Sequence, residues 1–406
     1  MREYFLVFLV GLTTTVLAAP FFRSLALRTG AVAKVRSRDV HQDATPYFGG
    51  LAMLAGVAAA FLFAAHLPFL SRYDSVPREA LSILGAASLI CLVGVLDDLF
   101  ELTPLLKAAG QVLAAAVTVA GGVRLLWIPW GDGIVTLDQT QSVVITVFAV
   151  FLITNAINFI DGLDGLAAGV VAIGAGAFFL YAYWLAAEED LVRAMSASLV
   201  TVVTCGVCLG YLPHNFHKAR MFMGDSGSML LGLLMAASAI SLTGQVDPFT
   251  LSGDEGLLAS AMPLILPFAV LALPLLDLVM AFCRRTWRGQ WWFKADKKHI
   301  HHMLLARGHS HIGAVLLMYG WAAAVSFGVL ALGLVPSRNT LIVVAVALAT
   351  IALATVVLSK PALDEQRAAA RQLATAVGRR RADPAGTEGA GQAIQPTDGA
   401  GSAEGF

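Results

Sequence analysis

The stretch Ser142–Gly165, SVVITVFAVFLITNAINFIDGLDG, decides the class of fold. Residues 142–160 are almost wholly apolar, and about 20 such residues let one α-helix span a bilayer. Polar side chains gather only toward the end of the stretch, from Asn155 to Asp164. The stretch therefore predicts a membrane-spanning helix whose end carries chemically active groups.

The composition of the whole chain also indicates a membrane protein. Of the 406 residues, 58% are hydrophobic and only 13% are charged, whereas soluble domains carry about 45–50% apolar and about 25% charged residues. The 27 Lys and Arg residues balance 27 Asp and Glu residues, so net charge gives no reason to expect nucleic-acid binding. So high an apolar content excludes disorder over most of the chain.

Further stretches of similar composition indicate about eleven transmembrane helices, and hence an all-α, polytopic integral membrane protein. The third stretch is short, and the ninth contains Pro263, Pro267 and Pro274 and is expected to kink. The expected spans are residues 4–22, 48–70, 80–96, 105–123, 142–160, 165–187, 191–212, 227–244, 256–283, 312–334 and 339–358.

The basic residues predict the orientation of these spans. With the N-terminus outside, 21 of the 27 Lys and Arg residues fall on the cytoplasmic side, where loops rich in these residues are retained. We therefore expect an external N-terminus and a cytoplasmic C-terminus in the cell membrane. Residues 1–360 would form the membrane-embedded domain. Residues 361–406 would form a cytoplasmic tail, helical as far as residue 381 and disordered in its Gly- and Ala-rich remainder.

A pair of carboxylates closes the third expected span. Asp97 and Asp98 end an apolar stretch, and Lys107 follows in the next segment. Charged groups at such a position are costly in lipid and are usually functional. Adjacent like charges also disfavour each other's ionised form unless a cation intervenes, and Lys107 or a divalent ion would supply it. The competing interpretation is a solvated helix end with no function.

The most specific pattern in the chain is a polar side chain at every third position, namely Asn155, Asn158, Asp161 and Asp164. In a straight α-helix four such positions spread over roughly 180°. They can converge on one ligand only if the helix tightens or breaks. Gly162 and Gly165 are placed to allow that break.

A Gly-Asp-Ser-Gly-Ser loop, residues 224–228, precedes the eighth expected span, and Asn215 lies shortly before it. Backbone N–H groups at a helix start suit an anion, and Asp225 beside them suits a hard cation that bridges to that anion. The string also invites a serine-protease interpretation. That interpretation needs an all-β fold with a paired His and Asp, which a bundle of helices does not supply.

The largest basic loop contains His299-Ile-His301-His302. Zinc binding is one interpretation, but no cysteine is near and the surrounding Lys and Arg residues repel a cation. A solvated loop is the second interpretation. Recognition of a phosphate group is the third, and the composition of the loop favours it.

A weaker pattern lies before the second expected span, where Arg38 and His41 are followed by Gly49 and Gly50. Alone, the pair of polar residues indicates little. Glycines at the start of a span let a helix approach another backbone or a ligand closely.

All these elements fall at the expected cytoplasmic ends of spans. Acidic metal ligands, helix N-termini and basic loops at one membrane face suit phosphoryl transfer between a soluble nucleotide and a membrane-held acceptor. The alternative from another class is an ion-coupled secondary transporter, which would carry its charged groups near mid-span on broken helices. The crowding at span ends favours the enzyme.

From about residue 20 to residue 335, the chain resembles the polyprenyl-phosphate N-acetylhexosamine-1-phosphate transferase superfamily. The resemblance rests on the Asp97-Asp98 pair, the run from Asn155, the Gly-Asp-Ser-Gly-Ser loop and the His-Ile-His-His loop, in the family's order. Residues 214–220 and the Arg38/His41 region are similar to the branch that uses UDP-N-acetylglucosamine. One departure is Ala33-Lys34-Val35, where members often carry Asp-x-Pro, so the carboxylate of that motif has no counterpart here.

The resemblance implies transfer of N-acetylglucosamine 1-phosphate from UDP-N-acetylglucosamine to a polyprenyl phosphate, with release of UMP. The product, polyprenyl-diphosphate-N-acetylglucosamine, would be the first lipid-linked step of a cell-envelope polysaccharide. The alternatives are the same reaction with another UDP-N-acetylhexosamine or with a muramoyl-pentapeptide nucleotide. The expected partners are the two substrates and the membrane, with no nucleic acid, and a homodimer is left open.

The resemblance also implies a role for each motif. Asp97 and Asp98 would position or deprotonate the lipid phosphate, and Lys107 would steer its charge. Asp225, with Asp98, would hold Mg²⁺, or Mn²⁺ in its place, across the diphosphate. The substrate-binding residues would be Asn155, Asn158, Asp161, Asp164 and Asn215 in the nucleotide pocket, Phe222 stacked on the uracil, His299, His301 and His302 at the sugar diphosphate, and Arg38 and His41.

The chemistry of the acceptor leaves one ambiguity. A phosphate monoester has a second pKa of about 6, so the lipid phosphate is mostly dianionic at neutral pH and does not require a strong general base. Asp97 would then matter more for placement than for proton removal. Direct transfer and a covalent aspartyl-phosphate route both remain open.

Overall fold

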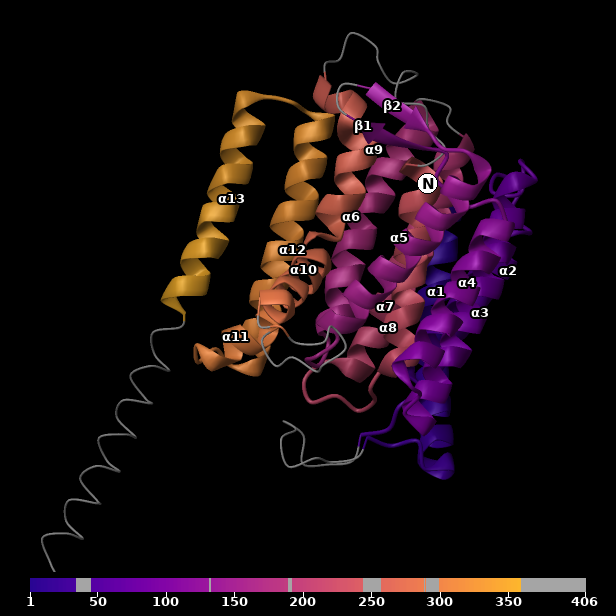
Figure 1. The fold of residues 1–406 in the computed structure, drawn as a ribbon, viewed down its shortest axis with the longest axis vertical. Coiled ribbons are helices and arrows are strands. Elements are labelled where there is room, and N and C mark those ends of the chain that lie inside the picture. The colour runs from indigo at the N-terminus through magenta and orange to yellow at the C-terminus, as the bar shows by residue number, and fades with distance from the viewer. Residues whose placement is uncertain are drawn as a thin grey trace, which may run out of the picture.

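A computed structural model describes residues 1–33, 45–130, 133–188, 192–243, 257–287, 289 and 299–358. In these ranges the chain forms long helices and one β-hairpin (Figure 1). The helices are α1 (Arg2–Thr29), α2 (Gly49–Ala64), α3 (Ser75–Phe100), α4 (Pro104–Ala120), α5 (Gln139–Ile160), α6 (Leu166–Glu188), α7 (Val192–Asn215), α8 (Gly224–Thr243), α9 (Leu257–Val270), α10 (Ala272–Trp287), α11 (Ile300–Ala306), α12 (His311–Leu334) and α13 (Arg338–Val357). The strands are β1 (Trp127–Trp130) and β2 (Gly133–Thr136).

Among the described residues, eight helices are long and apolar enough to cross a membrane: α1, α3, α5, α6, α7, α8, α12 and α13. α2 and α4 are apolar but shorter. The ninth expected span is divided into α9 and α10, which meet at Leu271. Pro274 has no N–H to donate to the carbonyl of Val270, so a regular helix is interrupted there. The prediction of an all-α polytopic membrane protein is thus confirmed in its coarse form.

Two elements differ from the sequence prediction. α3 is not short, because it runs from Ser75 to Phe100 and carries Asp97 and Asp98 in its last turn. The hairpin between α4 and α5 pairs β1 with β2 in antiparallel register and was not predicted. Aromatic and β-branched residues on both sides of a Gly-Asp-Gly string are a hairpin signal, but between two long apolar stretches they resemble an ordinary loop.

The core of the bundle is α8, whose residues Ser226–Thr243 are all buried. α2, α3, α5 and α7 pack against it. Two of these contacts leave no room for a side chain. A Cβ on Gly94 of α3 would lie 2.3 Å from the Cα of Ser226, and one on Gly50 of α2 would lie 2.4 Å from the N of Gly227. The prediction that Gly50 allows a close backbone approach is therefore confirmed.

The chain places its polar motifs at one end of the bundle (Figure 1). The N-terminus and the β-hairpin lie at the opposite end. The ends of α3, α5 and α7 and the starts of α4, α8 and α12 meet at the motif end, together with α11. The site described below is built where these helix ends converge.

Candidate active site

Asp98 joins the last turn of α3 to the first turn of α8. Its Oδ1 accepts a hydrogen bond from the backbone N–H of Asp225 at 2.9 Å, and its Oδ2 accepts one from Ser226 at 3.4 Å. The first N–H groups of a helix lack partners within the helix and carry partial positive charge, so a carboxylate suits them. A Cβ on Gly224 would lie 2.3 Å from Asp98 Oδ2. Asp98 therefore fixes the position of Asp225.

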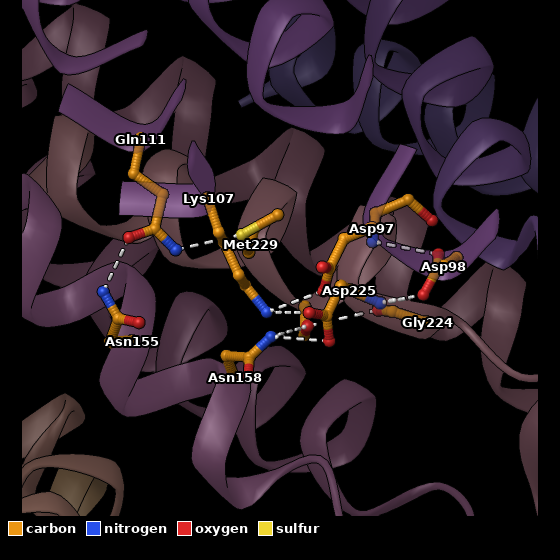
Figure 2. Close-up of polar contacts among 11 residues, drawn as sticks. Asp97, Asp98, Lys107, Gln111, Asn155, Asn158, Gly224, Asp225 and Met229 are labelled. Atoms are coloured by element: carbon orange, nitrogen blue, oxygen red, sulfur yellow. Dashed lines mark hydrogen bonds and ion pairs between the residues drawn. The ribbon is translucent and has the colours of Figure 1, made fainter. Parts of the chain in front are cut away.

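Lys107 lies between two carboxylates (Figure 2). Thr103 caps α4 by accepting a hydrogen bond from the N–H of Leu106, and this start places Lys107 opposite the end of α3. Lys107 Nζ lies 3.1 Å from Asp97 Oδ2 and also forms an ion pair with Asp225 Oδ2. The cation expected beside Asp97 is thus present, but it bridges to Asp225 instead of to Asp98.

The end of α5 reaches the same cluster through Asn158. Its Nδ2 donates hydrogen bonds to Asp225 Oδ1 at 3.0 Å and to Ser228 Oγ at 2.9 Å. Asp225 therefore receives contacts from α3, α4 and α5 (Figure 2). The side chains of Asp97, Lys107 and Asp225 remain partly exposed, so a substrate can reach them.

A second polar layer lies deeper between α4, α5 and α8. Asn155 Nδ2 donates to Gln111 Oε1 at 2.8 Å, and Gln111 Nε2 donates to Met229 Sδ at 3.0 Å (Figure 2). Gln111 was missed by the sequence analysis. Its signal was a lone amide among the apolar residues of α4. Asn155 lies beside the carboxylate cluster but makes its side-chain contacts with this second layer.

The turn after α5 breaks the helix, as the glycines predict. α5 ends at Ile160, α6 begins at Leu166, and Gly165 has a φ of 75°. The break sends Asp164 away from the carboxylate cluster. Asp164 Oδ2 accepts a hydrogen bond from the N–H of Ala219 at 3.1 Å. The side chains of Asn155, Asn158 and Asp164 therefore reach three different sets of partners.

Two histidines that the sequence analysis did not single out contact Asp164. His217 Nδ1 lies 3.8 Å from its Oδ2, and His311 Nε2 accepts from its backbone N–H at 3.1 Å. Candidate ligand atoms of the three residues lie within 4.8 Å of one another. Because the Asp164 oxygen and His311 Nε2 already accept backbone hydrogen bonds, the cluster fastens the turn between α5 and α6.

Asn215 connects that turn to the loop before α8. Its Oδ1 accepts from the N–H of Gly165 at 3.0 Å, and its Nδ2 donates to the carbonyl of Met221 at 3.0 Å. Asn215 is buried, so both amide groups need such partners. This contact holds the run that begins at Asn155 against the segment that contains Phe222.

Phe222 is held by the chain that leads into α2. Its N–H donates to the carbonyl of Pro46 at 2.9 Å, and its carbonyl accepts from the N–H of Gly49 at 3.1 Å. The Phe222 ring lies 6.3 Å from the ring of Tyr47, measured between centroids. The backbone at this position is therefore fixed on both sides, and two aromatic rings stand together beside the loop that carries Asp225.

The histidine loop forms α11 and packs against the turn after α5. A Cβ on Gly162 would lie 2.1 Å from His301 Nε2, so only glycine leaves room for this ring. The ring centroids of His301 and His302 lie 4.3 Å apart, and those of His299 and His301 lie 5.8 Å apart with nearly parallel planes. His299 Nδ1 also lies 2.8 Å from Asp277 Oδ2, a contact that the sequence patterns did not predict.

Burial changes the protonation of two groups here. Burial, followed by the charges of Asp98 and Asp164, raises the pKa of Asp161 to about 7, which favours the neutral form of this carboxyl. Burial and the neighbouring His302 lower the pKa of His301 to about 3. Neutral His301 can donate or accept hydrogen bonds but brings no positive charge to a phosphate.

Two predicted residues, Arg38 and His41, lie outside the described residues, as does the expected tail from residue 361. The described site instead consists of three neighbouring groups. The first is the carboxylate cluster of Asp97, Asp98, Lys107, Asn158 and Asp225; the second is the turn held by Asp164 and Asn215; the third is the histidine group on α11.

The carboxylate cluster has the donor set that suits a hard divalent cation. Its carboxylate oxygens come from Asp97, Asp98 and Asp225, and Mg²⁺ prefers oxygen ligands with only one or two carboxylates. Lys107 places a positive charge between two of these groups. Both oxygens of Asp98 accept backbone hydrogen bonds, and those of Asp225 contact Asn158 and Lys107, so a cation at this cluster would compete with these partners.

The chain belongs to glycosyl transferase family 4. The model of that family matches residues 80–243, the part that holds the carboxylate pair, the polar turn and the Gly-Asp-Ser-Gly-Ser loop. This class of membrane transferase agrees with the resemblance noted from the motifs.

Curated relatives cover most of the chain. It is 43% identical to the decaprenyl-phosphate N-acetylglucosaminephosphotransferase of Mycobacterium leprae, over 84% of this chain and 86% of the relative. It is 30% identical to the undecaprenyl-phosphate alpha-N-acetylglucosaminyl 1-phosphate transferase of Yersinia pestis, over 79% and 80%. The phospho-N-acetylmuramoyl-pentapeptide-transferase of Mycolicibacterium paratuberculosis is 31% identical, over 61% of this chain and 78% of its own.

Proposed function

We propose that the protein transfers N-acetylglucosamine 1-phosphate from UDP-N-acetylglucosamine to a polyprenyl phosphate and releases UMP. The observation that carries the proposal is the convergence of Asp98, Lys107 and Asn158 on Asp225, at the start of the buried α8. The 43% identity to the decaprenyl-phosphate N-acetylglucosaminephosphotransferase, over 84% of this chain, exceeds the 31% identity to the muramoyl-pentapeptide enzyme, over 61% of this chain, and so favours this donor. The product would enter cell-envelope polysaccharide synthesis.

The residues of the cluster divide the work between the two substrates. The acceptor phosphate is already mostly dianionic at neutral pH, so Asp97 and Lys107 serve to place it, with the Lys107 ammonium as its nearest positive charge. Asp98 keeps Asp225 in position through its hydrogen bonds to the first N–H groups of α8. We assign Asn158 and Asp161, at the end of α5, to contact with the nucleotide, and Asn155, Asp164 and Asn215 to holding the segments around it.

We propose that Asp225, with Asp98, holds Mg²⁺ in this cluster, with Mn²⁺ as a substitute. When bound, the ion would neutralise charge on the diphosphate and polarise the bond that breaks. The structure describes no cation besides Lys107 in direct contact with Asp225. A diphosphate placed beside these carboxylates would be repelled, since each like-charge pair about 4 Å apart costs roughly 4 kcal/mol at an effective dielectric near 20.

The histidine group is proposed to contact the sugar diphosphate. Neither ring nitrogen of His301 has a hydrogen-bond partner among the described residues, although both are buried. Buried polar atoms without a partner cost about 1–3 kcal/mol each. A hydroxyl or phosphate oxygen of the donor would supply the missing partner, and His302 lies on the more exposed side of the same group.

The direct test is a transferase assay on detergent-solubilised protein. With UDP-N-acetylglucosamine, a polyprenyl phosphate and Mg²⁺, we expect release of UMP and formation of the lipid-linked sugar. A panel that adds UDP-N-acetylgalactosamine and the muramoyl-pentapeptide nucleotide distinguishes the donors. Because no gradient exists in detergent, a secondary transporter would release no UMP, and that outcome would refute the proposal.

Phe222 provides a prediction for recognition of the uracil. Loss of a ring that stacks on a base typically costs about 1–3 kcal/mol, so Phe222→Ala should raise KM for the UDP-sugar about 5- to 150-fold. KM for the lipid should change little. Phe148→Ala is the matched control, because that ring is 62% exposed on α5 and lies on no motif. If only the lipid KM rises in the Phe222 variant, the ring belongs to the acceptor site.

We propose eleven spans with an external N-terminus and a cytoplasmic active site in the plasma membrane. The basic residues support this orientation. The position of the N-terminus and of the end of α13 at opposite ends of the bundle (Figure 1) supports an odd number of crossings. We also propose a homodimer, which a hydrodynamic measurement of the molecular mass in detergent would test.

Reporter fusions test this topology. A reporter placed after Lys360 is expected to be active in the cytoplasm, and one placed near Asp254 is expected to be external, because the loops with most Lys and Arg are retained inside. A phosphatase and a fluorescent protein, fused in turn at both positions, give opposite signals. If both positions report the same side, the eleven-span arrangement is wrong.

A further inference from the structure

A buried carboxylate on α10 holds the start of the histidine loop. Asp277 has no exposed surface. Its Oδ1 accepts a hydrogen bond from the N–H of Ile300 at 2.9 Å, and its Oδ2 lies 2.8 Å from His299 Nδ1. The two oxygens of one side chain thus contact the first backbone N–H of α11 and the ring of the residue before it.

The charge of Asp277 determines how the His299 ring is used. An ionised carboxylate only accepts hydrogen bonds, so Nδ1 of His299 carries the proton and donates. The ring is then fixed in one orientation and one tautomer, and Nε2 is the nitrogen that can act on a ligand. The ring is nearly buried, 9% exposed, and this limits its alternative rotamers.

His299 lies beside groups that belong to the polar run and to the turn after α5. Its ring is 5.6 Å from Phe159, which lies between Asn158 and Asp161 in the polar run. Its plane is nearly parallel to that of His301, which contacts Gly162 in the turn after α5. A carboxylate that fixes His299 therefore also fixes the group that we place at the sugar diphosphate.

We propose that Asp277 is a positioning residue for the donor substrate, which acts by presenting Nε2 of His299 to the sugar diphosphate. The inference rests on the proposed transferase function and assigns a role to a residue outside its motifs. The carboxylate is required in this role for a geometric reason. An asparagine has one oxygen in place of two, so it can accept at the position of Ile300 or at that of His299 but not at both, and an NH₂ group beside His299 would donate to Nδ1 and hold the ring in the other tautomer.

The predicted effect is a loss in use of the donor. Asp277→Asn should lower kcat/KM for UDP-N-acetylglucosamine about 10- to 100-fold, the usual scale for a residue that orients a functional histidine, and leave KM for the lipid unchanged. His299→Ala should lower it at least as much. Since Asp277 acts through His299, the double variant should be no worse than His299→Ala within about twofold, because residues that act as a unit are not additive.

A second pair of variants keeps the test valid if Asp277→Asn folds poorly. His299→Asn retains a donor near the position of Nδ1, and so the contact with Asp277, but lacks Nε2. His299→Gln places an amide nitrogen near the position of Nε2. We expect His299→Asn to keep the thermal stability of the wild type and lose activity, and His299→Gln to retain more activity. Asp138→Asn, an exposed N-cap of α5 at the opposite end, is the control for an Asp-to-Asn change.

The outcomes separate the two proposals. If the wild type shows no transfer with any UDP-sugar, the proposed function fails. If the wild type is active and Asp277→Asn and His299→Ala lower kcat/KM independently, so that their effects multiply in the double variant, Asp277 serves the fold and not His299. Full activity of His299→Asn would also overturn the inference, because Nε2 would then be dispensable.

Discussion

Replacement of Asp225 by alanine is expected to abolish turnover, with no recovery at any practical Mg²⁺ concentration. Asp225 is the residue on which α3, α4 and α5 converge, and alanine removes the carboxylate that Lys107 and Asn158 both contact. In the wild-type protein, a chelator should abolish activity, and added Mg²⁺ or Mn²⁺ should restore it. The measurement is UMP release across a Mg²⁺ titration for both proteins.

Asp225→Asn separates charge from shape in this experiment. The amide oxygen can still accept the hydrogen bond from Asn158, so folding should be preserved while binding of the cation is weakened. Binding of Mn²⁺ followed by electron paramagnetic resonance gives a readout independent of turnover. Full activity of Asp225→Ala in the presence of chelator would refute the metal assignment.

Neutralising either member of the carboxylate pair is the second change with a large expected effect. Asp97→Asn and Asp98→Asn should each lower kcat about 10²- to 10⁴-fold, the scale of a positioned acid–base group. The reasons differ between the two. Asp97 loses its charge beside Lys107, whereas Asp98 loses one of the two N–H groups that it holds at the start of α8.

Thermal unfolding distinguishes the two variants. An asparagine at position 98 can accept only one of the two hydrogen bonds, so Asp98→Asn should lower the free energy of unfolding by about 1 kcal/mol, the usual effect of losing a helix cap. Asp97→Asn should unfold near the wild-type temperature. Asp74→Asn, at the exposed start of the same helix, is the matched control. Near-normal kcat in both variants would instead support the competing interpretation, in which Asp97 and Asp98 are a solvated helix end with no function.

Sequence patterns predicted the helices well because a membrane-spanning helix can be recognised from a local run of apolar residues. A run such as residues 142–160 needs no tertiary information to be recognised. Boundaries were less exact. The expected span 80–96 stops where Asp97 begins, because a charged residue marks the end of an apolar run, yet the backbone stays helical to Phe100. The break at Leu271 was predictable because proline acts locally.

The site was harder to predict, because its contacts join residues of different helices and no single stretch of sequence shows which residues will meet. The motifs indicated that Asp225 and Lys107 are polar groups at helix ends, but not that they pair. The role of Asp277 could not be predicted for the same reason. It lies within an apolar segment, and its two partners are more than twenty residues away in the chain. The spacing of the run from Asn155 to Asp164 could not show that the turn directs Asp164 toward His217.

Gly50 and Gly94, which contact the start of α8, help to judge whether a related sequence can form the same helix packing. At positions 50 and 94, any added side-chain atom meets the backbone of Gly227 or Ser226. A chain with a larger residue at either position would have to move α2 or α3 away from α8. Movement of α3 would break the hydrogen bond between Asp98 and the N–H of Asp225. A distant sequence that keeps every acidic motif but lacks these glycines would therefore not assemble the carboxylate cluster described here.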